Sequence, residues 1–213
     1  MNQFNNNPWT TQGIGSPVPP QPPSFRISSF NSDITLAERG VDTTPTLTWN
    51  FQNGVPVTQN INGTVVPNAN RALIWTLPIN NTTVFTLQAF DGVVNRSNSL
   101  TVDFVHPIFV GAVISETPVE SEILAMGKRI ARPISWTQDF IIDDARTAVA
   151  IHSSLPRFNA IRETLFNLDV RSEFNIYVNI GITTNAGVQM YTVYIWNILQ
   201  NTMGGNQPLQ FAW

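Results

Sequence analysis

The sequence contains no cysteine, and this absence excludes several classes of structure. Without thiols the chain can form neither a disulfide framework nor a cysteine-ligated zinc site. No apolar run approaches the roughly 20 residues that a membrane-spanning helix needs. The opening residues, MNQFNNNPWTTQG, have neither the positive charge nor the apolar stretch of a secretory signal. We therefore expect a protein that is made in the cytoplasm and has no membrane partner.

Charged residues are also scarce, because they make up 12% of the chain, about half the usual share. The net charge is −3 and the isoelectric point is about 5.2, so no basic field is present to attract nucleic acid. Asn, Gln and Thr supply the polar surface in place of ions. Such a surface favours close packing between polypeptides, since fewer ions must lose their hydration.

Residues 1–24 differ from the rest of the chain. They carry no charge and hold six of the 15 prolines, a composition that favours extended backbone. One interpretation is a disordered tail, because few apolar side chains are available to offset the entropy of ordering. The other is an extended arm that docks on a partner. The arm hypothesis predicts partner-binding roles for Phe4, Trp9, Pro19, Pro20, Pro22 and Pro23.

Residues 25–106 show the pattern of a first β domain. Turn signals, among them Asn53-Gly54, Asn62-Gly63, Asn80-Asn81 and Asp91-Gly92, separate short segments of strand composition. These segments are residues 25–30, 34–40, 47–51, 57–62, 71–77, 83–90 and 99–105. Seven short strands with such punctuation predict an antiparallel β-sandwich of the immunoglobulin (Ig) kind. We expect Trp49 and Trp75 to pack in its core.

Residues 107–213 are expected to form a second domain. The segment HPIFVG, residues 106–111, is interpreted as the connection to it. A short helix is then predicted, with Thr117 as N-cap, Pro118 at the first helical position and Glu120 completing a capping box.

Strand patterns return after the helix, at residues 134–142, 147–153, 165–170, 173–182 and 188–199. Apolar residues alternate from Phe174 to Ile182, which predicts one buried face, and residues 183–187 resemble a turn. The last of these strands has aromatic residues on both faces and should be covered on both sides. The predicted fold is all-β: an N-terminal extended arm, an Ig-like antiparallel sandwich, and a second β-rich, sandwich-like domain with one short helix.

No residue pattern indicates catalysis or a cofactor. A triad could be drawn from His152, Ser153 and Asp144, but neighbouring residues on a strand point to opposite faces. Asp143 and Asp144 follow a strand and suit a turn better than paired acid–base work. Zinc, calcium, phosphate-loop and dinucleotide motifs are absent. We expect no enzyme activity, no metal and no cofactor.

The one basic cluster, GKRIARP at residues 127–133, contains Lys128, Arg129 and Arg132. Its basic residues suit the last turn of the preceding helix, where they would complement the helix dipole. A contact to a phosphate or to an acidic patch of a partner is the alternative. No aromatic-rich basic groove surrounds the cluster, so nucleic-acid binding is not expected.

Four stretches together resemble a known module. PTLTWNF (45–51), VTQNIN (57–62), TVFTLQAFDG (83–92) and SLTVDFVHPIFVG (99–111) are similar to the Ig-like module in structural proteins of tailed bacteriophages. The later residues resemble the module that often follows it, through the helix start at residues 117–120, FNAIRETLFNLDV (158–170) and YTVYIW (191–196). The resemblance covers about residues 34–197. AIHSSLP (150–156) departs from it, because relatives often carry a Tyr/Phe-rich stretch there.

This resemblance implies a structural virion protein of the tail, neck, baseplate or fibre-attachment region, made in the host cytoplasm. Its partners would be other virion proteins and copies of itself, in a trimer or hexamer. Besides the arm residues, the terminal segment with Trp213 is predicted to make contacts. The alternatives are a capsid decoration protein and a host-surface glycan-binding module of a fibre. In the glycan alternative Trp136, Tyr191 and Trp196 would stack on sugars.

Overall fold

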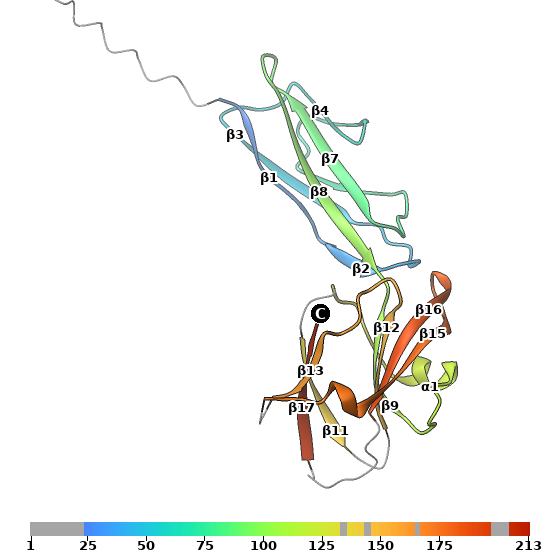
Figure 1. Ribbon diagram of the computed structural model, residues 1–213. Coiled ribbons are helices and arrows are strands. Elements are labelled where there is room, and N and C mark those ends of the chain that lie inside the picture. Colours follow the sequence, from blue (N-terminus) through green and yellow to red (C-terminus); the bar gives the residue numbers. More distant parts are fainter. Residues whose placement is uncertain (1–23, 133–135, 143–145, 165–166, 197–204) are drawn as a thin grey trace, which may run out of the picture.

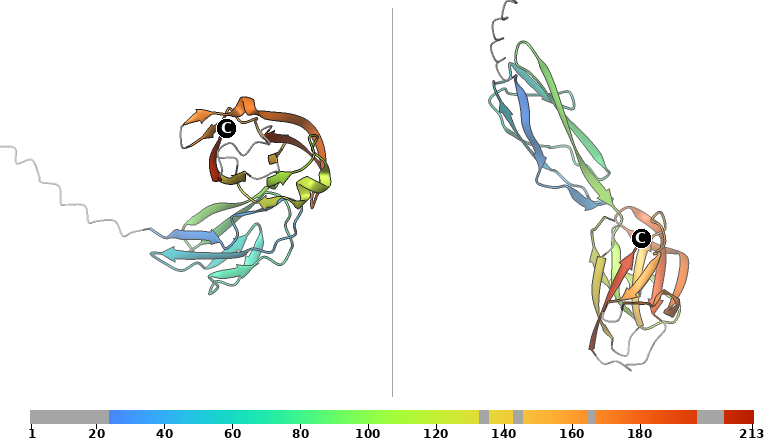
Figure 2. Two further views of the ribbon diagram at one scale, coloured as in Figure 1. Left: turned by 90° about the horizontal axis from the view of Figure 1, so that it is seen from below. Right: turned by 60° about the vertical axis from the view of Figure 1, so that its left-hand side comes forward.

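The computed structural model describes residues 24–132, 136–142, 146–164, 167–196 and 205–213. Within these residues the chain forms two β-sandwiches that lie end to end (Figures 1 and 2). Strands up to residue 105 form the sheets of the first sandwich, and strands from residue 108 onward form those of the second. The prediction of an all-β chain with one short helix is confirmed.

The first sandwich has the predicted immunoglobulin-type arrangement. One sheet has the order β1 (Arg26–Ser32), β3 (Thr46–Gln52) and β6 (Ala72–Ile74). The other has the order β2 (Leu36–Glu38), β8 (Asn95–Val105), β7 (Thr83–Phe90), β4 (Thr58–Ile61) and β5 (Thr64–Val66). All pairs are antiparallel except β2 with β8, which is parallel. The seven predicted strands are present, and β5 is an additional one.

Trp49 lies in the core of this sandwich with 1% of its surface exposed, as predicted. Its indole N–H donates to Oε1 of Gln59 at 3.0 Å, and the Gln59 amide donates in turn to the carbonyl of Asn70 at 3.1 Å. The buried indole N–H therefore keeps a partner, which avoids a cost of about 1–3 kcal/mol. Trp75 lies at the edge of the core, half-buried, with its ring edge-on to Phe85.

The predicted Asn-Gly turns adopt the backbone that this dipeptide favours. Asn62 and Gly63 connect β4 to β5 with φ values of 48° and 82°. Asn53 and Gly54 also have positive φ, at 60° and 149°. Positive φ is accessible to Gly and, among other residues, mainly to Asn and Asp. These turns could therefore be predicted from the sequence.

The second sandwich contains a sheet of five strands and a sheet of four. The first has the order β10 (Gly127–Arg129), β9 (Ile108–Val113), β12 (Arg146–His152), β16 (Gly187–Trp196) and β15 (Phe174–Thr184). The second has the order β11 (Trp136–Ile142), β17 (Gly205–Ala212), β13 (Ala160–Glu163) and β14 (Leu168–Asp169). A short 3₁₀ helix, η1, spans Arg171–Glu173.

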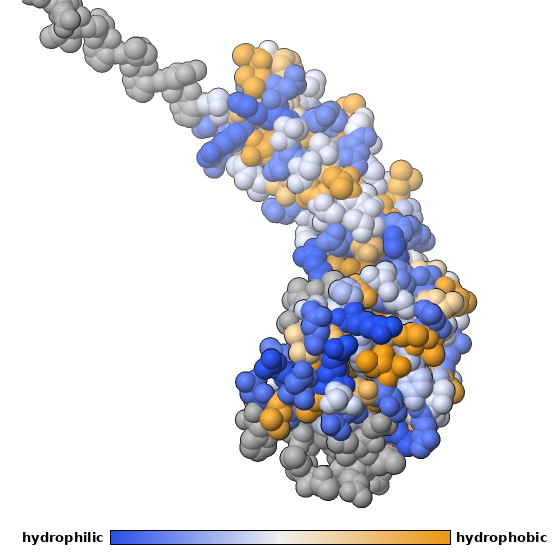
Figure 3. All heavy atoms as spheres, viewed as in Figure 1, coloured by the Kyte–Doolittle hydropathy of each residue, from blue (hydrophilic) through white to orange (hydrophobic). Residues whose placement is uncertain are grey.

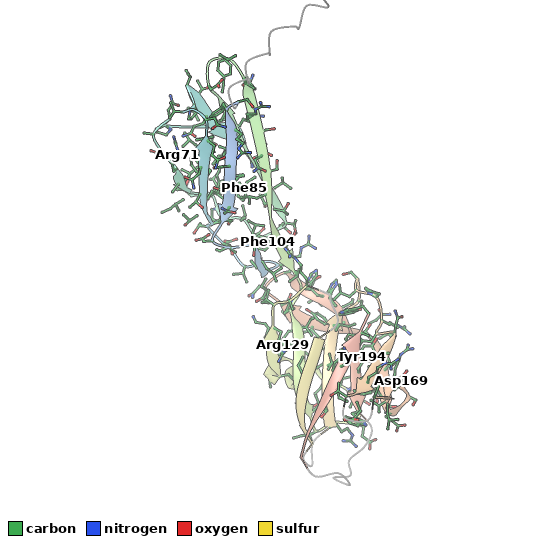
Figure 4. The ribbon with its side chains drawn as sticks, turned by 90° about the vertical axis from the view of Figure 1, so that its left-hand side faces the viewer. Arg71, Phe85, Phe104, Arg129, Asp169 and Tyr194 are labelled. Carbon is green, nitrogen blue, oxygen red and sulfur yellow. The ribbon has the colours of Figure 1, made fainter. Side chains whose placement is uncertain are left out.

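The five-stranded sheet has a hydrophobic core on each face. On one face Tyr194, which is labelled in Figure 4, and Trp196 pack with Phe158 and Phe211, which come from the side of the second sheet. On the other face Tyr191 packs with a cluster that includes residues of helix α1 (Glu120–Ala125). From Tyr191 to Trp196, strand β16 is thus covered on both sides within the chain, as its aromatic pattern predicted.

The segment HPIFVG connects the two sandwiches only through His106 and Pro107, because the residues from Ile108 onward form β9, an interior strand of the five-stranded sheet. Ile108 and Val110 join one core cluster, and Phe109 joins the other. A run of apolar residues without alternation is what a strand buried on both faces requires. Strand β17 was not predicted, whereas β13 and β14 pair within residues 158–170, where the resemblance implied a strand pair.

The expectation of one buried face along residues 174–182 was also wrong. A β-bulge between Tyr177 and Ile180 shifts the register, and Asn179 adopts a φ of 59°. An extra residue reverses the side-chain alternation beyond it. Phe174 therefore packs in the cluster between the sheets, whereas Ile182 packs in the cluster beneath the helix.

The predicted capping box was wrong as well. Helix α1 begins at Glu120 after Val119, which makes no side-chain cap, so Thr117 and Pro118 lie before the helix. The Glu120 carboxylate accepts instead from the backbone N–H of Thr183 at 2.6 Å, which lowers the pKa of Glu120. Glu122 accepts from Ser115 in the same way. The acidic residues hold neighbouring segments in place rather than capping their own helix.

Candidate functional site at the junction of the two sandwiches

The junction between the two sandwiches brings polar residues of both domains together. Strand β8 leads into β9 through only two residues, His106 and Pro107. The end of β2, followed by Arg39 and Gly40, faces the turn Asn185–Ala186 between β15 and β16. Because the connection is short and the turns touch, the two domains share a contact surface.

Glu38 is the central ion of this junction. Its side chain, 10% exposed, lies 2.7 Å from Nζ of Lys128 and accepts a hydrogen bond from the Asn185 amide at 2.9 Å. Both carboxylate oxygens thus bind groups from the second sandwich. A carboxylate this buried must be paired, since removing one partner would leave a poorly solvated charge.

A second ion pair joins Arg132 to Asp103, with Nε 3.0 Å from Oδ2. Both side chains are about a third or more exposed, so this pair contributes about 0–1 kcal/mol. Lys128 and Arg129 lie in strand β10, and no basic residue lies in the last turn of α1. Their predicted role at the helix C-terminus was therefore wrong.

Gly40 permits the close approach of the two domains. Its φ is +87°, and a Cβ built on it would lie 2.4 Å from the carbonyl carbon of Asn185 and 2.5 Å from the nitrogen of Ala186. Side-chain carbons essentially never come so near to backbone atoms. Only glycine fits this position of the junction.

The two histidines of the chain stack on each other beside Gly40's turn. The rings of His106 and His152 have centroids 3.6 Å apart and are inclined by 6°. Burial lowers the pKa of His106 to about 4, and the charges of His152 and Arg39 add to this effect. Burial and Arg39 also lower the pKa of His152, against a hydrogen bond with Gln189. Both rings are therefore neutral at pH 7, which allows them to stack.

A polar pocket of about 470 Å³ opens at this junction. Its lining includes Arg39, Asn80 and Asn81 from the first sandwich, and Asn185 and Gln189 from the second. His106 also lines it, and the Nδ1 atom of this histidine is buried with no hydrogen-bond partner. The arrangement can donate hydrogen bonds to a ligand and offers one positive charge.

Most of the predicted partner-binding residues lie outside the described part of the chain. These are the arm residues Phe4, Trp9, Pro19, Pro20, Pro22 and Pro23. Trp213 is described and half-buried, and its ring packs against Phe158 with centroids 4.5 Å apart. Its contact with a partner stays a prediction.

The sugar-stacking role suggested for aromatic residues is not supported where the structure describes them. Tyr191 is fully buried, and its hydroxyl donates to the carbonyl of Pro107 at 3.2 Å. Trp196 is 7% exposed and stacks on Phe174. The side chain of Trp136 lies outside the described residues. Neither buried ring can present a face to a sugar.

The triad considered from the sequence does not form in the described residues. The Nδ1 atom of His152 contacts Oγ of Ser154 at 2.6 Å rather than Ser153, and its Nε2 contacts Gln189. Asp143 and Asp144 lie outside the described part of the chain. In the part that is described, no three His, Asp or Glu residues cluster as metal ligands.

Sequence reasoning missed the residues that form the junction. One of the predicted strands ends in ERG, residues 38–40. Two charges beside a glycine are unusual in a chain with so few charged residues, and this pattern could have indicated the site. The contact of Glu38 with Asn185, 147 residues away, could not be predicted from the sequence, because it depends on how the two domains meet.

Comparison with known proteins gave no match to a family model, to a curated protein or to a solved structure. Among the described residues no helix is both long enough and apolar enough to cross a membrane.

Proposed function

We propose that the chain is a structural component of a tailed-phage virion, made in the host cytoplasm and assembled through protein–protein contacts in the tail, neck, baseplate or fibre region. The observation that carries the proposal is the junction, where Glu38 binds Lys128 and Asn185 across the two sandwiches. A fixed junction makes the two domains one elongated spacer. The role of this spacer is to keep neighbouring virion proteins at a fixed separation, and the role includes no catalytic step.

The close contact at the junction supports a spacer rather than two tethered modules. The connection is two residues long, and the glycine at position 40 lets two turns touch. Flexible tethers have the opposite character, with longer and Gly/Ser-rich sequences. Domain motion is the default only where the interface is weak.

The surface offers apolar contacts for other polypeptides. Val188 and Met190 lie on the same face of β16 as the buried Tyr194 and Trp196, but they are 65% and 48% exposed. Val178 of the neighbouring strand β15 is exposed as well. On the face shown in Figure 3, apolar residues are interspersed with polar ones over both sandwiches. These features, with the low charge, support contacts with other virion proteins and with copies of the chain in a trimer or hexamer.

The point from which the proposed arm extends is firmly held. Phe25 is 2% exposed, and its carbonyl accepts from Nε of Arg96 at 2.9 Å. The carbonyl of Ser24 accepts from the Asn53 amide at 3.2 Å. This anchor lies at the end of the first sandwich far from the second (Figure 1). We place arm docking at this end of the spacer.

Incorporation into particles tests the proposal. The full chain and a variant that lacks residues 1–23 would each be expressed in infected cells. The amount of each protein in the purified particles would then be measured. The full chain should be incorporated, and the deletion should not, although its melting temperature should be unchanged. A Phe4→Ala/Trp9→Ala double variant should behave like the deletion, and Gln3→Ala like the full chain. Normal incorporation of the deletion would overturn the arm role, and exclusion of the full chain would overturn the structural role.

A further inference from the structure

We propose that the junction pocket is a binding site for an acidic sugar, with Arg39 as the group that binds its carboxylate. This role is separate from the spacer function and does not depend on it. The pocket lies between two domains and, at about 470 Å³, falls within the usual range of small-ligand sites.

Arg39 is an exposed residue whose Nε and backbone N–H are both hydrogen-bonded. Its Nε donates to Oδ1 of Asn81 at 3.2 Å, and its backbone N–H donates to the carbonyl of Val105. Within the described residues, no hydrogen bond or ion pair uses its two terminal nitrogens. A fixed guanidinium with two free parallel N–H groups matches the two oxygens of a carboxylate.

A chain of side-chain hydrogen bonds orients this arginine. Asn81 donates to Oδ1 of Asn80 at 2.7 Å, and Asn80 donates to Oδ1 of Asp42 at 3.1 Å. The direction of donation is the same at every step, from Arg39 to the Asp42 carboxylate, and all three bonds lie at exposed sites. Such preorganisation reduces the ordering that a ligand must impose when it binds.

The charge of Arg39 is not neutralised by a direct ion pair within the described part of the chain. The neighbouring Glu38 binds Lys128 and Asn185 instead, and Asp42 reaches Arg39 only through two amides. The field of Arg39 reaches both stacked histidines, where it disfavours protonation. The lining of the pocket therefore carries one positive charge without a direct ion pair in the described residues, which an anionic ligand would neutralise.

The remaining groups fit hydroxyls better than a second anion. Asn185 donates to Glu38 and keeps its carbonyl oxygen, and the amides of Asn80, Asn81 and Gln189 also line the pocket. Amide groups both donate and accept, which matches sugar hydroxyls. A carboxylate side chain of a partner protein would use Arg39 but would leave these groups unpaired, so the observations favour an acidic sugar.

Titration of the ¹⁵N-labelled full chain with sodium glucuronate tests the proposal by NMR. The controls are glucose, which lacks the carboxylate, and N-acetyl glutamate amide, which stands for a partner's side chain. Glucuronate should give saturable shifts at Arg39, Asn81 and His106 at concentrations up to ~50 mM, well above the ~1 mM Kd of a weak ligand. Glucose and the glutamate derivative should bind at least ~tenfold more weakly, because each lacks part of the contact set.

Two substitutions test the arginine. Arg39→Gln should weaken glucuronate binding by ~tenfold or more, whereas Arg26→Gln, which removes an exposed charge from β1, should not change it. Asn81→Asp would place a carboxylate on the guanidinium and should also weaken binding, which keeps the test valid if Arg39→Gln fails to fold. Equal glucuronate binding by wild type and Arg39→Gln, absence of saturable shifts, or tighter binding of the glutamate derivative would each overturn the proposal.

Discussion

Replacing Gly40 with alanine tests whether the junction holds the two sandwiches together. The new Cβ would lie 2.4 Å from backbone atoms of Asn185, whereas ordinary contacts begin at 3.4 Å. The two turns must therefore separate by about 1 Å, because neither can yield alone: the N–H of Gly40 is bonded to the Asn80 carbonyl at 3.1 Å. This movement would break the hydrogen bond between Asn185 and Glu38.

The expected loss can be estimated from the contacts involved. A hydrogen bond to a charged group contributes about 1.5–3 kcal/mol, and the ion pair with Lys128, whose side chain is 45% exposed, adds up to about 1 kcal/mol. An alanine at φ +87° also strains the backbone by about 1–2 kcal/mol. The Gly40→Ala variant should thus lose about 1.5–4 kcal/mol of domain contact, with a separate strain cost to the first sandwich.

Gly63→Ala is the matched control, because Gly63 has a φ of +82° and a Cβ added there would have no atom beyond its chain neighbours within 4 Å. It carries the strain without the clash. Small-angle scattering and hydrogen exchange at Asn185 and Ala186 should show a looser junction in Gly40→Ala and an unchanged junction in Gly63→Ala. If the two variants give the same scattering curve and the same exchange at these amides, the reasoning about the junction is refuted.

Three further outcomes are expected. Trp49→Ala should destabilise the first sandwich by about 3–5 kcal/mol, and an unchanged melting temperature would contradict its core position. Below pH 6.5 the unfolded chain takes up protons that His106 and His152 resist, so the free energy of unfolding should fall as the pH falls from 6.5 to about 4. For His106 the fall is at most about 3 kcal/mol, and less after solvent screening at this partly exposed site. His106→Gln should flatten this pH profile in urea unfolding, and an unflattened profile would contradict the assignment. Glu38→Gln should weaken the junction by about 1–2 kcal/mol, measured as faster amide exchange at Asn185.

Local chemistry explains why much of the first sandwich could be predicted. Asn62-Gly63 requires positive φ, and the alternation in β7 and β8 follows directly from one buried face. Trp49 stands in such an alternating strand, and the structure buries it. These features depend on a few neighbouring residues, so a single sequence contains them.

The second sandwich was harder to predict because its signals depend on tertiary contacts. Strand β9 is buried on both faces and shows no alternation, and the bulge at Asn179 divides one apolar pattern between two cores. Glu120 resembled a capping residue because its spacing from Thr117 fits a capping box. It binds Thr183 instead, 63 residues away. No local pattern encodes that choice.

The junction site was beyond sequence reasoning for the same reason. Arg39 and Asn81 are 42 residues apart, and Asn185 comes from the other sandwich. Each of these residues alone is an ordinary surface residue. They form a site only because the parallel pairing of β2 with β8 brings the end of β2 to the second domain.

Quantitative mass spectrometry of purified particles tests the central claim most directly. The account predicts that the chain is present in purified tailed particles. Its copy number per particle should be a multiple of three for a trimer, or of six for a hexamer. Its absence from the particles, while it is abundant in the infected-cell lysate, would contradict the account.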